Sequence, residues 1–106
     1  MRGRLGNFDV MVMLAVLRLG REAYGVLICR ELERRLRGRR VALGSVYAAL
    51  ERLERRGWVA ASLGEATPRR GGRAKTYYAV TAEGLREVRE SRQTLLSFWK
   101  SIPQLR

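Results

Sequence analysis

The sequence predicts a mainly α-helical fold with one small β-hairpin, built as a compact domain followed by a long C-terminal helix. Three observations predict it. Before Gly57 one segment is continuously apolar and two carry apolar residues at helical spacing, two strand-like runs flank the Gly71–Gly72 pair, and a heptad pattern runs through residues 81–106. A chain of 106 residues with 46% hydrophobic and 30% charged residues has the composition of one globular domain.

A first helix is expected from residue 7 or 8 to residue 19, because Gly20 is a typical residue for ending a helix. Its apolar residues run without interruption over 10–17, which indicates burial on more than one side. In so small a domain this favours contact with a second subunit, in which we place Phe8 and Met11. The apolar run is too short to span a membrane, which takes roughly 20 residues, so we expect a cytoplasmic protein without a membrane partner.

A second helix is expected from about Tyr24 to Arg37, with Gly38 after its end. Cys29 is the only cysteine and falls within the apolar pattern, so we interpret it as a small core residue, with a redox sensor as the alternative. Five arginines cluster at the C-terminal end of this helix and just after it. We interpret them as a solvated face at a helix C-terminus, with contact to a phosphate backbone as the alternative. They are Arg34, Arg35, Arg37, Arg39 and Arg40.

A third helix is expected to begin near Gly44 or Ser45 and to stop at Gly57, after a very short strand at Val41–Leu43. Serine, tyrosine and arginine on its free face suit a DNA groove, because N-terminal amides favour phosphate and the arginine fork can pair with a guanine edge. The residues predicted to face inward are Val46, Ala49, Leu50 and Leu53. Those predicted to face outward are Ser45, Tyr47, Ala48, Glu51, Arg52 and Arg55.

Two strands are expected at about 58–63 and 74–80, joined by a glycine turn. A last helix is expected from Ala82 to Lys100, with Thr81 as its N-cap. Its apolar residues are spaced as a heptad seam that favours coiling against another helix, and packing on its own domain is the alternative. The seam consists of Leu85, Val88, Arg92, Leu95, Trp99 and Ile102, with Arg92 as its one polar member.

The charge balance indicates a polyanionic partner. The net charge is +12 and the pI is about 11.4, and the sign is uneven: residues 1–80 hold 17 cations and 7 acids, whereas residues 81–106 hold 5 and 3. The chain has no histidine and a single aspartate, Asp9, so the usual zinc sites and histidine acid–base catalysis are not expected. Glu51 and Glu54 stand beside arginines on a helix surface and are better interpreted as ion pairs than as a catalytic couple. We therefore expect neither an enzyme nor a cofactor.

The predicted order of elements is that of a winged helix-turn-helix, over residues 1–80, followed by a dimerisation helix over 81–106. The sequence resembles the PadR family of bacterial transcriptional regulators, in its compact form with one C-terminal helix. The matching segments are E-A-Y-G-V-L-I at 22–28, G-S-V-Y-A-A-L-E-R-L-E-R-R-G-W-V at 44–59, G-G-R-A-K-T-Y-Y at 71–78 and T-A-E-G-L at 81–85.

The resemblance implies a homodimeric repressor that binds a pseudo-palindromic operator, with the third helix in the major groove and the hairpin on the flanking DNA. It implies groove or phosphate contacts for Ser45 and Tyr47 and wing contacts for Arg73 and Lys75. Arg52 and Arg55 are added from their outward facing. The alternative is an architectural protein that binds nucleic acid without sequence preference, and a winged helix used for protein contacts is a further one.

The resemblance also implies a possible small hydrophobic effector at the dimer interface, because compact family members bind flat aromatic molecules against tryptophans of the last helix. Trp99 is the candidate here, one turn later than the family position, where Leu95 stands. Packing at the subunit interface is the alternative for this tryptophan. The complete set of expected interface residues is Phe8, Met11, Leu85, Val88, Leu95, Trp99 and Ile102.

Overall fold

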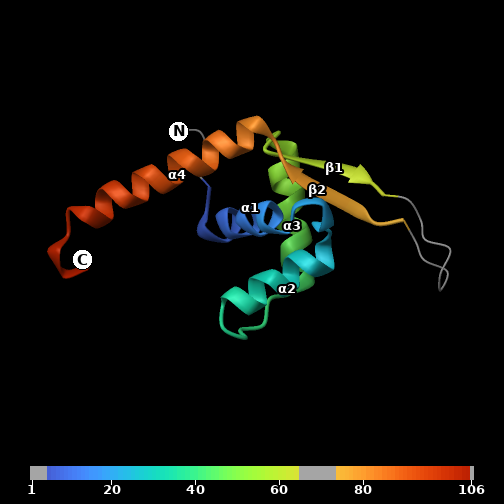
Figure 1. Cartoon of the computed structure of the whole chain (residues 1–106), viewed down its shortest axis with the longest axis horizontal. Coiled ribbons are helices and arrows are strands. Elements are labelled where there is room, and N and C mark those ends of the chain that lie inside the picture. The colour runs from blue at the N-terminus through green and yellow to red at the C-terminus, as the bar shows by residue number, and fades with distance from the viewer. Residues whose placement is uncertain (1–4, 65–73, 106) are drawn as a thin grey trace.

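The computed structural model describes residues 5–64 and 74–105. Its described elements follow the predicted order of three helices, a hairpin and a long helix, so the predicted fold class is confirmed (Figure 1). They are α1 (Asn7–Leu19), a 3-10 turn (Gly20–Glu22), α2 (Gly25–Arg35), α3 (Leu43–Arg55), β1 (Val59–Leu63), β2 (Thr76–Val80), α4 (Ala82–Lys100) and a 3-10 turn (Pro103–Leu105).

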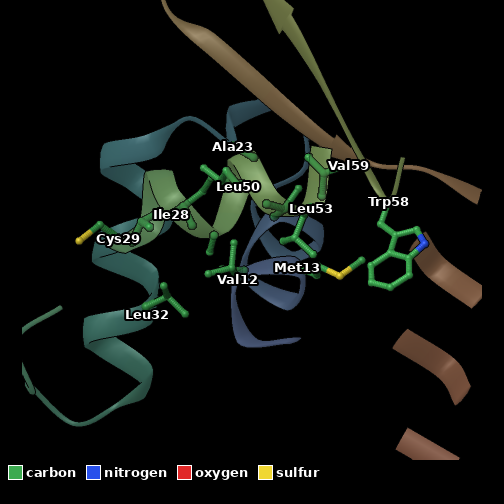
Figure 2. Close-up of a cluster of buried hydrophobic side chains, with 14 of the residues drawn as sticks. Val12, Met13, Ala23, Ile28, Cys29, Leu32, Leu50, Leu53, Trp58 and Val59 are labelled. Atoms are coloured by element: carbon green, nitrogen blue, oxygen red, sulfur yellow. The ribbon is translucent and has the colours of Figure 1, made fainter. Parts of the chain in front are cut away.

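The core lies between α1, α2 and α3 and is closed on one side by the start of β1 (Figure 2). α1 contributes Val12 and Met13, and α3 contributes the four residues predicted to face inward, all of which are buried. Cys29 is also buried in this cluster, as predicted, and its thiol donates to the Val41 carbonyl at 3.2 Å. α1 has apolar residues on its exposed face as well, where Leu14 is 48% and Leu17 is 42% exposed.

The two strands pair antiparallel, from Val59 opposite Val80 to Leu63 opposite Thr76. The expected short strand at Val41–Leu43 is not formed, and this prediction was wrong. The Val41 amide donates to the Glu33 carboxylate at 2.9 Å and the Val41 carbonyl accepts from Cys29, so side chains of α2 satisfy groups that a sheet partner would take. β2 instead meets the segment before α2, where Tyr24 makes an isolated bridge to Tyr77.

α2 ends at Arg35, two residues earlier than predicted, and its end is a Schellman motif. The Gly38 amide donates to the Glu33 carbonyl at 2.9 Å, and the Arg37 amide donates to the Arg34 carbonyl at 3.3 Å. The left-handed position of the motif belongs to Arg37, with φ of 59°, and not to glycine, although Gly38 beside it has φ of 84°. A left-handed arginine costs about 1 kcal/mol relative to glycine.

α4 begins at the predicted N-cap. The Thr81 hydroxyl accepts from the Gly84 amide at 3.0 Å and donates to the Gly57 carbonyl at 2.7 Å, which fastens the helix to the end of α3. Gly84 is buried, and a Cβ built there would lie 2.1 Å from the Trp58 carbonyl oxygen. From this close contact α4 runs away from the three-helix body, and the longest extent of the chain is 56 Å (Figure 1).

Candidate nucleic-acid interface

All six residues predicted to face outward on α3 are exposed. The helix begins earlier than predicted, at Leu43, with Ala42 as its N-cap and no side-chain cap. Ser45 is therefore the third helical residue, and its amide donates to the Ala42 carbonyl at 3.0 Å. The Ser45 side chain has no hydrogen-bond partner among the described residues. Its hydroxyl is thus free to meet a ligand on the outer face of α3.

The two predicted arginines of α3 already contact carboxylates within the chain. Arg52 binds Asp9 of α1 through two of its guanidinium nitrogens, with Nη2 at 2.7 Å and Nε at 3.4 Å from the two carboxylate oxygens. The hydrogen bond and charge of Asp9 raise the pKa of Arg52. Arg55 lies 3.6 Å from Glu51 in an exposed i, i+4 pair. A nucleic-acid phosphate would have to share these arginines with the carboxylates or displace the carboxylates.

The hairpin is joined to the helical body by tyrosines. The rings of Tyr24 and Tyr77 meet edge to face with centroids 5.6 Å apart, and the Tyr78 amide donates to the Ala23 carbonyl at 2.8 Å. Burial raises the pKa of Tyr78, as do the neighbouring Tyr47 and Glu54 of α3. All four tyrosines of the chain therefore gather where α2, α3 and β2 meet, and they fix the hairpin relative to α3.

The four tyrosines form what we call the tyrosine junction. Of the predicted contact residues, one belongs to this junction and a second contacts it. Tyr47 is 44% exposed, and its ring covers Gly25 at the start of α2, where an added Cβ would lie 2.2 Å from the Tyr47 hydroxyl oxygen. Lys75 is exposed just before β2, at the loop end of the paired strands, with its ammonium nitrogen 4.8 Å from the centroid of the Tyr24 ring. Arg73 lies outside the described residues. The described part of the hairpin thus brings one predicted cation close to the start of α2.

Sequence reasoning missed the acids that organise the arginine-rich end of α2. Glu31 is 6% exposed and binds Arg34 at 2.6 Å and Arg35 at 3.1 Å, with Arg18 of α1 at 3.6 Å. The hydrogen bonds from Arg34 and Arg35 hold the pKa of Glu31 below its usual value. The signal was available in the i, i+3 and i, i+4 spacing of these residues, but the burial of Glu31 against α1 is a tertiary feature.

The expected interface residues divide along the chain. Val88 is 8% exposed and belongs to the core of its own chain, so it has little surface left for a partner. Phe8, Met11 and Leu85 are partly buried. The far half of α4 and the residues after it are open to solvent in the single chain: Leu95 is 50%, Phe98 66%, Trp99 53%, Ile102 40% and Leu105 50% exposed. Such a contiguous apolar surface is unusual on a monomer.

A sequence model described as the transcriptional regulator PadR-like family matches residues 13–90. The chain belongs to this family. The matched residues begin within α1, include α2, α3 and both strands, and reach into α4. A search of curated protein sequences returned no match.

Solved structures agree with the PadR assignment. The chain is similar to a transcriptional regulator from Clostridium thermocellum, with a TM-score of 0.74 and 23% identity over 91% of this chain and 86% of that one. It is similar to a PadR family regulator from Clostridium difficile R20291, with a TM-score of 0.72 and 23% identity over 93% and 97%. A PadR family regulator from Eggerthella lenta gives 0.71 and 27% over 92% and 82%.

These matches identify a PadR-like transcriptional regulator with a winged helix-turn-helix DNA-binding fold. Its relatives are regulators of transcription, not enzymes. Within residues 5–64 and 74–105, no helix is long and apolar enough to cross a membrane.

Proposed function

We propose that this PadR-like protein is a repressor that binds a pseudo-palindromic operator as a homodimer. The observation that carries the proposal is the open face of α3, with Ser45 and Tyr47 exposed near its start and the hairpin fixed beside it by the tyrosine junction. The net charge of +12 supplies the attraction to a phosphate backbone. The family match supports regulation of transcription through DNA.

In the proposed complex the first half of α3 enters the major groove. Ser45 and Tyr47 contact bases or phosphates there, and Lys75 with Arg73 reaches the flanking backbone or the minor groove from the hairpin. Arg52 and Arg55 can contact DNA only if each weakens or breaks its ion pair, with Asp9 and Glu51 respectively. The lost ion-pair free energy reduces what these contacts add to the binding free energy. Phosphate contacts fix the register of the protein, and the few side chains within the groove select the sequence.

The proposed dimer uses the far half of α4 as its main contact. Leu95, Trp99 and Ile102 are half-exposed along one heptad seam, and association with a second copy removes this apolar surface from water. Phe8 and Met11 of α1 and Leu85 of α4 add to the contact where they are still exposed. Two-fold symmetry then sets the half-sites about one helical turn, roughly 34 Å, or a multiple of it apart.

A small hydrophobic effector at the dimer interface belongs to the same proposal. Trp99 offers an aromatic face that is 53% exposed in the single chain, beside Phe98 at 66%. A flat aromatic molecule bound between two such surfaces would change how the subunits are spaced, and with it the distance between the two recognition helices. Titration of the dimer with planar aromatic dyes, read by quenching of Trp99 against a Trp99→Leu variant, tests this part separately.

The experiment for the function begins with selection of preferred duplexes from a random pool by the full-length protein. Fluorescence anisotropy then compares the selected palindrome, a single half-site and a scrambled duplex of the same composition. Tighter binding of the palindrome, with a stoichiometry of two chains per duplex, is the expected result. Equal binding to all three duplexes would instead support the architectural alternative, and binding without salt dependence would exclude a phosphate interface.

A further inference from the structure

The turn between α2 and α3 carries charge that the fold does not use. Arg37, Arg39 and Arg40 are exposed, and none of them has an ion pair or hydrogen bond from its side chain to another described residue. The nearby acids are engaged elsewhere: Glu31 binds Arg34 and Arg35, and Glu33 accepts from the Val41 amide. These three arginines form the unpaired arginine turn.

The backbone of this turn is held firmly. The Schellman bonds fix its start, and Val41 at its other end is bound on both sides, by Glu33 at its amide and by Cys29 at its carbonyl. Arg37 occupies a left-handed conformation that glycine adopts without strain, while glycine stands one residue later. A fixed turn that keeps an arginine in an unfavourable backbone position suggests that the charge at this place has a use.

The turn leads directly into α3, which begins at Leu43. A recognition helix contacts bases through its N-terminal residues, so the residues just before it lie at the edge of the groove, where the phosphates are. In Figure 1 the turn lies at the bottom of the body, whereas the hairpin extends to the right. The two basic segments are thus well placed to reach phosphates on different sides of α3.

From this placement we infer that the unpaired arginine turn is a second phosphate-binding surface, which grips the DNA backbone separately from the hairpin. The inference rests on the proposed DNA binding but not on a particular operator. Arginine bound to phosphate positions a protein without reading sequence, so this surface adds affinity and salt dependence equally on every duplex.

The test replaces Arg37, Arg39 and Arg40 together by glutamine in the full chain. A matched control replaces Arg86, Arg89 and Lys100 by glutamine as well. These three exposed cations of α4 are not members of the heptad seam and lack partners among the described residues. Both variants lose the same charge. Anisotropy titrations from 0.05 to about 1 M salt, on matched and scrambled duplexes, give the slope of log affinity against log salt. Gel filtration verifies that the oligomeric state is unchanged.

The turn variant is expected to lose about 2.7 from the magnitude of that slope for each bound subunit, at about 0.9 per phosphate contact. The loss of affinity relative to the parent is therefore about 500-fold larger per subunit at 0.1 M than at 1 M salt, on matched and scrambled duplexes alike. The control should keep the parent slope. An unchanged slope in the turn variant, or an equal loss in both variants, overturns the inference. A parent that binds all duplexes equally would contradict the operator proposal while leaving the slope test of the turn intact.

Discussion

Replacement of Gly84 by alanine is expected to destabilise the fold, although the same change in an open helix stabilises it. Alanine is favoured over glycine inside a helix by about 1 kcal/mol. At Gly84, however, the new Cβ would lie 2.1 Å from the oxygen and 2.9 Å from the carbon of the Trp58 carbonyl, and 3.0 Å from Met13 Cε. The Trp58 carbonyl is a backbone group that also accepts from the Thr81 amide at 3.0 Å, so α4 must move by about 1 Å or more to relieve the contact.

Overpacking of this kind costs about 1 to 3 kcal/mol, and loss of the Thr81 bond adds about 1 kcal/mol, which together outweigh the helix gain. The expected net loss is about 1 to 3 kcal/mol, or a fall in Tm of about 4 to 8 °C for each kcal/mol in a domain of this size.

Gly44→Ala is the matched control for Gly84→Ala, because a Cβ at Gly44 in α3 meets nothing within 4 Å. This variant should be stabilised by up to about 1 kcal/mol. Thermal and urea unfolding, followed by circular dichroism at one fixed protein concentration, measures both variants and holds the contribution of the proposed dimer constant. If Gly84→Ala is as stable as the parent, the close approach of α4 to β1 is not a constraint and this reasoning is refuted.

Three further substitutions test individual contacts. Arg37→Gly should raise the free energy of unfolding by about 0.5 to 1 kcal/mol, because it relieves the left-handed arginine, and should lower DNA affinity at low salt; a variant that gains both would contradict the phosphate role. Thr81→Ala should cost about 1 to 2 kcal/mol in urea unfolding, through loss of the N-cap and of the hydrogen bond to Gly57, whereas Thr81→Ser should keep most of both. The pKa of Glu31 is lower in the folded than in the unfolded protein, so its contribution to folding stability is full above about pH 4.3 and is lost as the pH falls through the folded-state pKa. Glu31→Gln should therefore weaken the acid dependence of the urea midpoint. An identical pH profile in the variant would argue against the role of the Arg34 and Arg35 pairs.

Local signals in the sequence were enough to predict the helices that form the core and the last helix. The inward residues of α3 follow a clear three- and four-residue spacing, and Thr81 is followed by a long regular helix, so both predictions are confirmed. The errors occurred where a tertiary contact replaced a local preference. Val41 has the β-branched side chain typical of a strand, but its backbone is bound by Glu33 and Cys29 and forms none.

The sequence was enough to predict which side chains of α3 face outward, but not which ion pairs they form. Helical periodicity placed Arg52 on the outer side of α3, yet it could not show that Asp9, 43 residues earlier, would bind the guanidinium. Likewise, Gly38 was expected to end α2, because glycine usually occupies the left-handed position of a helix end. Arg37 occupies that position instead, a choice that only the backbone geometry reveals.

The acids of the helical body neutralise a selected part of its positive charge. Glu31 binds two arginines of its own helix and lies 3.6 Å from Arg18 of α1, and Asp9 of α1 binds an arginine of α3, so these pairs support the helical body. The arginine turn receives no such partner within the described residues, which leaves mutual repulsion next to the start of α3. A polyanion at this surface relieves the repulsion and adds its own binding free energy. The same cations that weaken the free protein should therefore make its folding stability rise with DNA concentration, and more at low salt than at high salt.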